Sequence, residues 1–139
     1  MKDTLPDKPS ELIRVALADL RKVERSKKYV VYMGVYHEPD RGRGGKCFVC
    51  LAGAVMAKSL SAARDRPLFP EDFPKPVKHK LIAIDSLRIG HIRESMDYLG
   101  KRLPKTIPHY IDVEDYGDDP AQFNRDMRKL AKLLEDHGL

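Results

Sequence analysis

Apolar residues recur at intervals of three and four in several parts of the chain, the spacing that places them on one face of an α-helix. Ser10 and Asp119 each stand just before such a pattern and are the expected N-caps of the first and last helices. Gly90 separates two shorter patterns and is expected to break the chain into two helices. Helices are therefore predicted from Ser10 to about Lys28, over residues 77–89, over residues 92–99 with an end at Gly100, and from Pro120 to just before Gly138, which stands at the C′ position.

The stretch Cys47–Leu60 has a different pattern, because it carries no charge as far as Ala57. A helix without a polar face must be buried, and this one is too short to cross a bilayer. Its small residues, Gly53 and three alanines in particular, would let neighbouring backbones come close. We therefore expect Cys47–Leu60 to form a central, buried helix.

Two short segments favour strands instead. Tyr29–Tyr36 is rich in β-branched and aromatic residues, and residues 107–113 are expected to pair with it after an intervening turn at His37–Asp40. A chain of 139 residues is typical of one domain. The prediction is a mainly α fold, a single compact domain over residues 1–139 with four to five helices around a buried central helix. A short two-stranded ribbon and a flexible tail over residues 1–9 complete it.

Composition points to the interior of the cell rather than to secretion. The N-terminal residues are polar and contain no apolar core of a signal peptide, and no apolar run is long enough to span a membrane. The two cysteines lie three residues apart in an apolar run, which favours reduced thiols over a disulfide framework. We expect a cytoplasmic protein without a membrane partner.

The net charge of +5 conceals an uneven distribution. Residues 1–105 carry 22 Lys and Arg against 13 Asp and Glu, whereas residues 106–139 carry 4 against 8. The excess of positive charge in the first part suggests an acidic partner, either nucleic acid or the acidic face of a protein. The candidate binding residues are the stripe of arginines on the first helix and the glycine-rich loop before Cys47: Arg14, Arg21, Arg25, Arg41, Arg43 and Lys46.

Specific chemical motifs are weak in this sequence. The Arg41–Lys46 loop departs from the P-loop pattern, because Asp40 and Cys47 stand where glycine and Ser or Thr are required, so a phosphate site is only an alternative to a mobile loop. None of the five histidines has a paired spacing that would complete a zinc site with the cysteines, so no metal or cofactor is expected.

A cysteine-dependent reaction is a further alternative. Cys47 at a helix N-terminus beside Lys46 would have a lowered pKa, and His37 could act as its base. A buried, structural thiol is the favoured interpretation, because cysteine is among the most buried residue types.

Three stretches together resemble small uncharacterised proteins of tailed bacteriophages and prophages. They are KCFVCLAGAVMAKSL at 46–60, LIAIDSLRIG at 81–90 and DPAQFNRDMRKLAKLLEDHGL at 119–139. The resemblance covers about a third of the chain and implies no activity or catalytic residue. It implies a setting, an accessory protein made in an infected bacterial cytoplasm that acts by binding a host factor.

The functional hypothesis from sequence is therefore a non-enzymatic protein that binds a host protein through the basic surface. Direct binding of nucleic acid by the same surface is the alternative, and a cysteine-dependent enzyme is the third class. A helix-turn-helix about Gly90 is disfavoured, because Asp85 and His91 occupy positions where that motif needs apolar residues.

Overall fold

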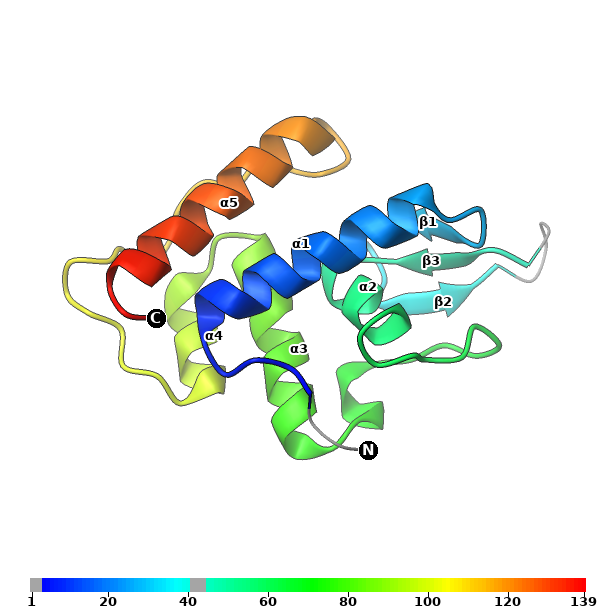
Figure 1. The fold of residues 1–139 in the computed structure, drawn as a ribbon, viewed down its shortest axis with the longest axis horizontal. Helices are drawn as coiled ribbons and strands as arrows, with labels where there is room; N and C mark the ends of the chain where they lie inside the picture. Colours follow the sequence, from blue (N-terminus) through cyan, green and yellow to red (C-terminus); the bar gives the residue numbers. More distant parts are fainter. Residues whose placement is uncertain (1–3, 41–44) are drawn as a thin grey trace.

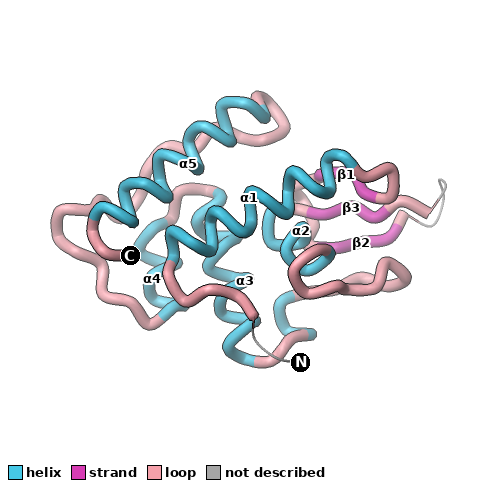
Figure 2. Tube along the Cα trace, in the orientation of Figure 1, coloured by secondary structure: helices cyan, strands magenta, loops and turns pink. Residues whose placement is uncertain are grey.

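A computed structural model describes residues 4–40 and 45–139 (Figures 1 and 2). Half of the chain is helical and a small three-stranded sheet accompanies the helices, so the predicted mainly α fold is confirmed. The helices are α1 (Pro9–Arg25), α2 (Leu51–Ala57), α3 (Lys75–Arg88), α4 (Ile92–Leu99) and α5 (Pro120–Asp136), with a short 3-10 helix at Pro70–Asp72. The strands are β1 (Tyr29–Val31), β2 (His37–Pro39) and β3 (Cys47–Val49).

Helix α2 lies at the centre of the protein, as expected, and all of its seven residues are buried. It packs against α1 and α3 and against the strands β2 and β3. The predicted helix over Cys47–Leu60 was nevertheless too long, because Cys47–Val49 forms strand β3 and Cys50 is the N-cap of α2. The Cys50 thiol accepts a hydrogen bond from the Gly53 amide at 3.4 Å. A uniformly apolar run does not distinguish a buried strand from a buried helix, which explains the error.

The backbone approaches α2 closely at Gly53, which confirms the role predicted for its small residues. A Cβ atom at this position would lie 1.6 Å from the carbonyl oxygen of Tyr36 and 3.1 Å from Cβ of Val49. That same carbonyl accepts a hydrogen bond from the Cys50 amide at 3.2 Å. Only glycine fits here, and its presence lets the segment before β2 lie directly on α2.

The sheet is a mixed three-stranded sheet rather than the expected two-stranded ribbon. Its order is β1-β3-β2, with β1 parallel and β2 antiparallel to β3. The segment His37–Asp40 was expected to be a turn, but His37–Pro39 is strand β2, and the strand expected over Tyr29–Tyr36 ends at Val31. Residues 107–113 form no strand and make only one isolated bridge, between Tyr110 and His91.

The first helix begins earlier than predicted and ends sooner. Lys8 is its N-cap, so the prediction that Ser10 caps the helix was wrong; the Ser10 hydroxyl instead donates to the carbonyl of Leu139 at 2.6 Å. The helix ends at Arg25, which leaves Lys28 outside it. Ahead of α1, Leu5 is 6% exposed and its carbonyl accepts a hydrogen bond from Lys80 Nζ at 2.8 Å.

Three local predictions for the second half of the chain are confirmed. Gly90 separates α3 from α4 with a φ of +77°, and Gly100 ends α4 in the left-handed conformation. Asp119 caps α5 by accepting a hydrogen bond from the Gln122 amide at 3.1 Å. Between α4 and α5 the chain runs as a long loop over the surface (Figure 2). In the described part of the chain, no helix is both long and apolar enough to cross a membrane.

Candidate functional site

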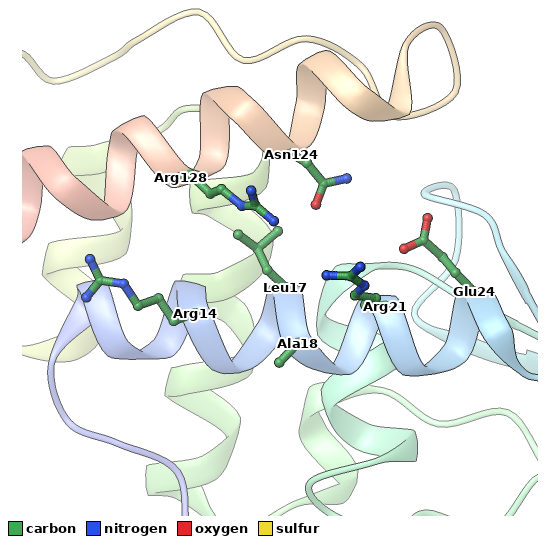
Figure 3. Close-up of a pocket in the computed structure, with 7 residues that line it drawn as sticks. All are labelled: Arg14, Leu17, Ala18, Arg21, Glu24, Asn124 and Arg128. Atoms are coloured by element: carbon green, nitrogen blue, oxygen red, sulfur yellow. The ribbon is translucent and has the colours of Figure 1, made fainter.

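Helices α1 and α5 pack side by side, and a groove of about 590 Å³ lies between them (Figures 1 and 3). Three arginines take part in its lining, two from α1 and one from α5. The lining residues are Arg14, Leu17, Ala18, Arg21 and Glu24 of α1 with Asn124 and Arg128 of α5. We call this feature the basic groove.

The helical repeat explains why these side chains meet in one place. On α1 the lining residues follow at intervals of three, one, three and three, so they share one side of the helix. The buried stripe of the same helix faces α2 and the rest of the core and consists of Leu12, Ile13, Ala16, Leu20 and Val23. On α5, Asn124 and Arg128 are one turn apart beside a buried stripe of their own. At this groove the two helices therefore face each other through residues beside their buried stripes, and several of these residues are polar.

Two of the three arginines in the basic groove have no anionic partner among the residues that the structure describes. Arg14 forms an ion pair with Glu135 of α5, and Glu24 accepts a hydrogen bond from the Tyr116 hydroxyl at 2.7 Å. Arg21 and Arg128, in contrast, form no side-chain hydrogen bond or ion pair with any residue in 4–40 or 45–139. Figure 3 shows their guanidinium groups in the space between the helices, on either side of Leu17.

The structure brings together only some of the residues predicted from sequence. Arg14 and Arg21 line the basic groove, and Arg25 is exposed on the last turn of α1, one turn beyond Arg21. Lys46 is exposed just before β3, and Arg41 and Arg43 lie outside the described residues. Arg128 was not among the predicted binding residues, although it lies on a basic stripe of α5, because the sequence does not say which face of α5 meets α1.

Cys47 and His37 are neighbours, as the alternative of a cysteine nucleophile required. The Cys47 sulfur lies 3.6 Å from each ring nitrogen of His37, across the β2–β3 pair. Both side chains are buried, and burial raises the pKa of the Cys47 thiol and lowers the pKa of His37. Cys47 also lies in a strand rather than at a helix N-terminus, so the expected cause of a lowered pKa is missing. The thiol is protonated at neutral pH and shielded from solvent.

Metal-ligating side chains do not gather in the described ranges. No group of three or more His, Cys, Asp and Glu side chains there is placed to hold a metal ion. The basic groove is thus the place where the structure brings predicted binding residues, Arg14 and Arg21, together.

Comparison of this chain with protein-family models gives no match. No curated protein matches it, and neither does any solved structure. The chain is a mainly α protein with a small mixed sheet, and the basic groove is its candidate functional site.

Proposed function

We propose that this chain is a binding protein that holds an acidic segment of a partner protein in the basic groove. The observation that carries the proposal is the pair Arg21 and Arg128. These two guanidinium groups from adjacent helices lie in one groove and have no anionic partner in residues 4–40 and 45–139. Arg25, exposed on the last turn of α1, extends the proposed basic surface beyond the groove.

The chemistry of the groove matches a carboxylate-bearing peptide. Each guanidinium offers parallel N–H donors that fit a carboxylate in a bidentate pair, and such charge-assisted bonds contribute about 1.5–3 kcal/mol when they are shielded from water. Leu17, which points from α1 toward α5 beside the arginines (Figure 3), supplies an apolar surface on which the aliphatic part of a peptide can pack. An acidic segment with two carboxylates a turn apart would satisfy both guanidinium groups at once.

The carboxylates around the groove favour a protein over nucleic acid as the partner. Glu24 lines the groove, and Glu135 and Asp136 lie on the last turn of α5, each beside a cation. A phosphate backbone, with a negative charge at every nucleotide, would be repelled at these positions, whereas a polypeptide can place neutral or basic residues there. Taken with the resemblance to phage proteins, this supports a host bacterial protein in the cytoplasm as the partner.

The experiment that tests the proposal is capture of partners from bacterial lysate on the immobilised chain, with and without nuclease. The test variant reverses both unpaired charges, Arg21→Glu with Arg128→Glu. The matched control reverses two exposed arginines outside the groove, Arg93→Glu with Arg102→Glu, so that both variants carry the same net charge. Circular dichroism of each variant checks that the helices are intact.

We expect one protein to be captured in both nuclease arms by the wild type and the control, and to be lost with the groove variant. Its binding should then be reproduced by an acidic peptide from that protein. Capture that disappears with nuclease and weakens steeply with salt would replace the proposal with nucleic-acid binding. Equal capture by the groove variant and the control would refute a role for the basic groove.

A further inference from the structure

A second group of hollows lies away from the basic groove and is organised around one arginine. The hollows have volumes of about 590, 200 and 120 Å³, and Met33 and Arg88 line all three. All three lie between the segment after β1 and the last turn of α3, and the segment 113–117 lines the two larger ones. We call this feature the Arg88 hollow. Its size is that of a site for a small molecule.

Arg88 is held in place by a chain of side-chain hydrogen bonds. Its Nε donates to Asp85 Oδ1 at 3.0 Å, and Asp85 Oδ2 accepts from the Tyr36 hydroxyl at 3.2 Å. The side chains of Arg88 and Asp85 are only 20% and 27% exposed, which strengthens their pairing relative to a surface pair. The Nη groups of Arg88 form no hydrogen bond with a residue that the structure describes. A restrained guanidinium with its terminal N–H groups unused is preorganised to bind a carboxylate end-on.

A negative charge also lines this hollow. Asp115 lines the two larger parts of it, together with Met33 and Arg88. Asp115 Oδ1 accepts a hydrogen bond from the Gly117 amide at 2.9 Å, while Oδ2 has no partner in the described part of the chain. Glu114 adds a second carboxylate to the 200 Å³ part. Asp85 already balances the charge of Arg88, so Asp115 and Glu114 would repel a ligand that carries only negative charge. A ligand with only positive charge would leave the Nη groups of Arg88 without a hydrogen-bond acceptor.

The walls between these charges are aromatic and apolar. Tyr32 is 57% exposed and lines the largest part with Met33 and Tyr116. The Tyr116 ring is fixed, because it packs edge-on against Phe123 at 5.6 Å and its hydroxyl donates to Glu24 at 2.7 Å. Such walls suit a flat apolar group, which would stack on or against the tyrosine rings.

We propose that the Arg88 hollow binds a free α-amino acid with an aromatic side chain. The carboxylate of the ligand pairs with the Nη groups of Arg88, its ammonium group pairs with Asp115, and its ring lies between Tyr32 and Tyr116. This site shares no lining residue with the basic groove, although the Tyr116 hydroxyl donates to Glu24 of that groove.

The test is a titration of the full chain, followed by NMR at the Met33 methyl group and the Tyr116 ring. Three probes share the same side chain and differ in their charged groups: L-phenylalanine carries both charges, N-acetyl-L-phenylalanine lacks the ammonium group, and L-phenylalanine amide lacks the carboxylate. We expect saturable shifts with L-phenylalanine at a dissociation constant of about 1 mM or lower, and binding at least about tenfold weaker for each derivative. Absence of shifts up to about 10 mM, or equal binding of a singly charged derivative, would overturn the proposal.

Variants separate the two charge contacts from an effect on folding. Arg88→Gln and Asp115→Asn should each weaken L-phenylalanine binding by at least about tenfold, while the exposed Arg93→Gln should leave it unchanged. Asp115→Asn retains the oxygen that accepts from Gly117 and lies on the surface, so it remains informative if Arg88→Gln disturbs Asp85. Unchanged binding in Asp115→Asn would refute the site, whatever the fate of the basic-groove variants.

Discussion

Substitution of Gly53 by alanine is the sharpest test of how the core is built. Alanine is the better helix former and would by itself stabilise α2 by about 1 kcal/mol. The added Cβ would, however, lie 1.6 Å from the carbonyl oxygen of Tyr36. Since Cβ contacts shorter than 3.0 Å are essentially never observed, the backbone at Tyr36 must move by at least 1.4 Å, the difference between these two distances.

The expected cost follows from the contacts that this movement breaks. Overpacking against a backbone atom costs about 3 kcal/mol, the upper end of the usual range, because a carbonyl cannot rotate away as a side chain can. The displaced carbonyl also loses its hydrogen bond from the Cys50 amide, now 3.2 Å long, which costs about 1 kcal/mol. After subtraction of the gain in helix propensity, Gly53→Ala should lower the free energy of unfolding by about 3 kcal/mol.

Urea unfolding followed by circular dichroism measures this change directly. With a slope of about 2 kcal/mol per M, the midpoint should fall by about 1.5 M. Gly117→Ala is the matched control, because the nearest atom to its new Cβ is Asp115 Oδ1 at an ordinary 3.5 Å, and it should change the stability by less than about 0.5 kcal/mol. A Gly53→Ala variant as stable as the wild type would show that α2 and the Tyr36 backbone are not in such close contact.

Two further predictions concern buried ionisable groups. Burial raises the pKa of Asp19 above the value of 3.8 that it has in the unfolded chain, although the Ser59 hydroxyl donates a hydrogen bond to its carboxylate at 2.5 Å. The folded state is therefore favoured by the protonated form of Asp19, and this contribution to the free energy of unfolding is lost as the pH rises from 3.8 through the folded pKa. Asp19→Asn should therefore gain in melting temperature relative to the wild type between about pH 3.5 and about pH 7; a constant difference would contradict this. Burial also raises the pKa of Cys47, and that of Cys50 to about 11, so iodoacetamide should label both thiols only on unfolding in urea, as followed by mass spectrometry. Rapid labelling of Cys47 in the native protein would contradict this prediction and would support the alternative of a cysteine-dependent enzyme.

Local signals in the sequence account for the parts of the fold that could be predicted. Gly90, Gly100 and Asp119 end or begin helices through their own conformation or side chain, so neighbouring residues suffice to place them. Strand β3 has no such signal, because its alternation of buried Cys47, half-buried Phe48 and buried Val49 is hidden in an apolar run. Its pairing with β1 and β2 depends on contacts with residues far away in the sequence.

The candidate site was predictable to the same limited extent. The spacing of Arg14 and Arg21 on α1 already places them on one side of the helix, and both line the basic groove. Neither the partner of Arg14, Glu135, nor the second unpaired guanidinium, Arg128, follows from such spacing. Both come from α5, and which face of α5 meets α1 is decided by packing of the whole core.

Strand β3 lies between β1 and β2, and this position affects how the protein unfolds. Both flanking strands precede β3 in the chain, and β3 leads through Cys50 directly into the buried helix α2. In the described part of the chain, β3 is the only strand that pairs with β1 or β2, although His37 of β2 also forms a single bridge with Leu68. Residues 47–49 cannot leave the sheet without pulling on the core helix. The sheet and α2 therefore form one cooperative unit, whose amide hydrogens exchange with solvent together and at the rate of global unfolding rather than by local fraying.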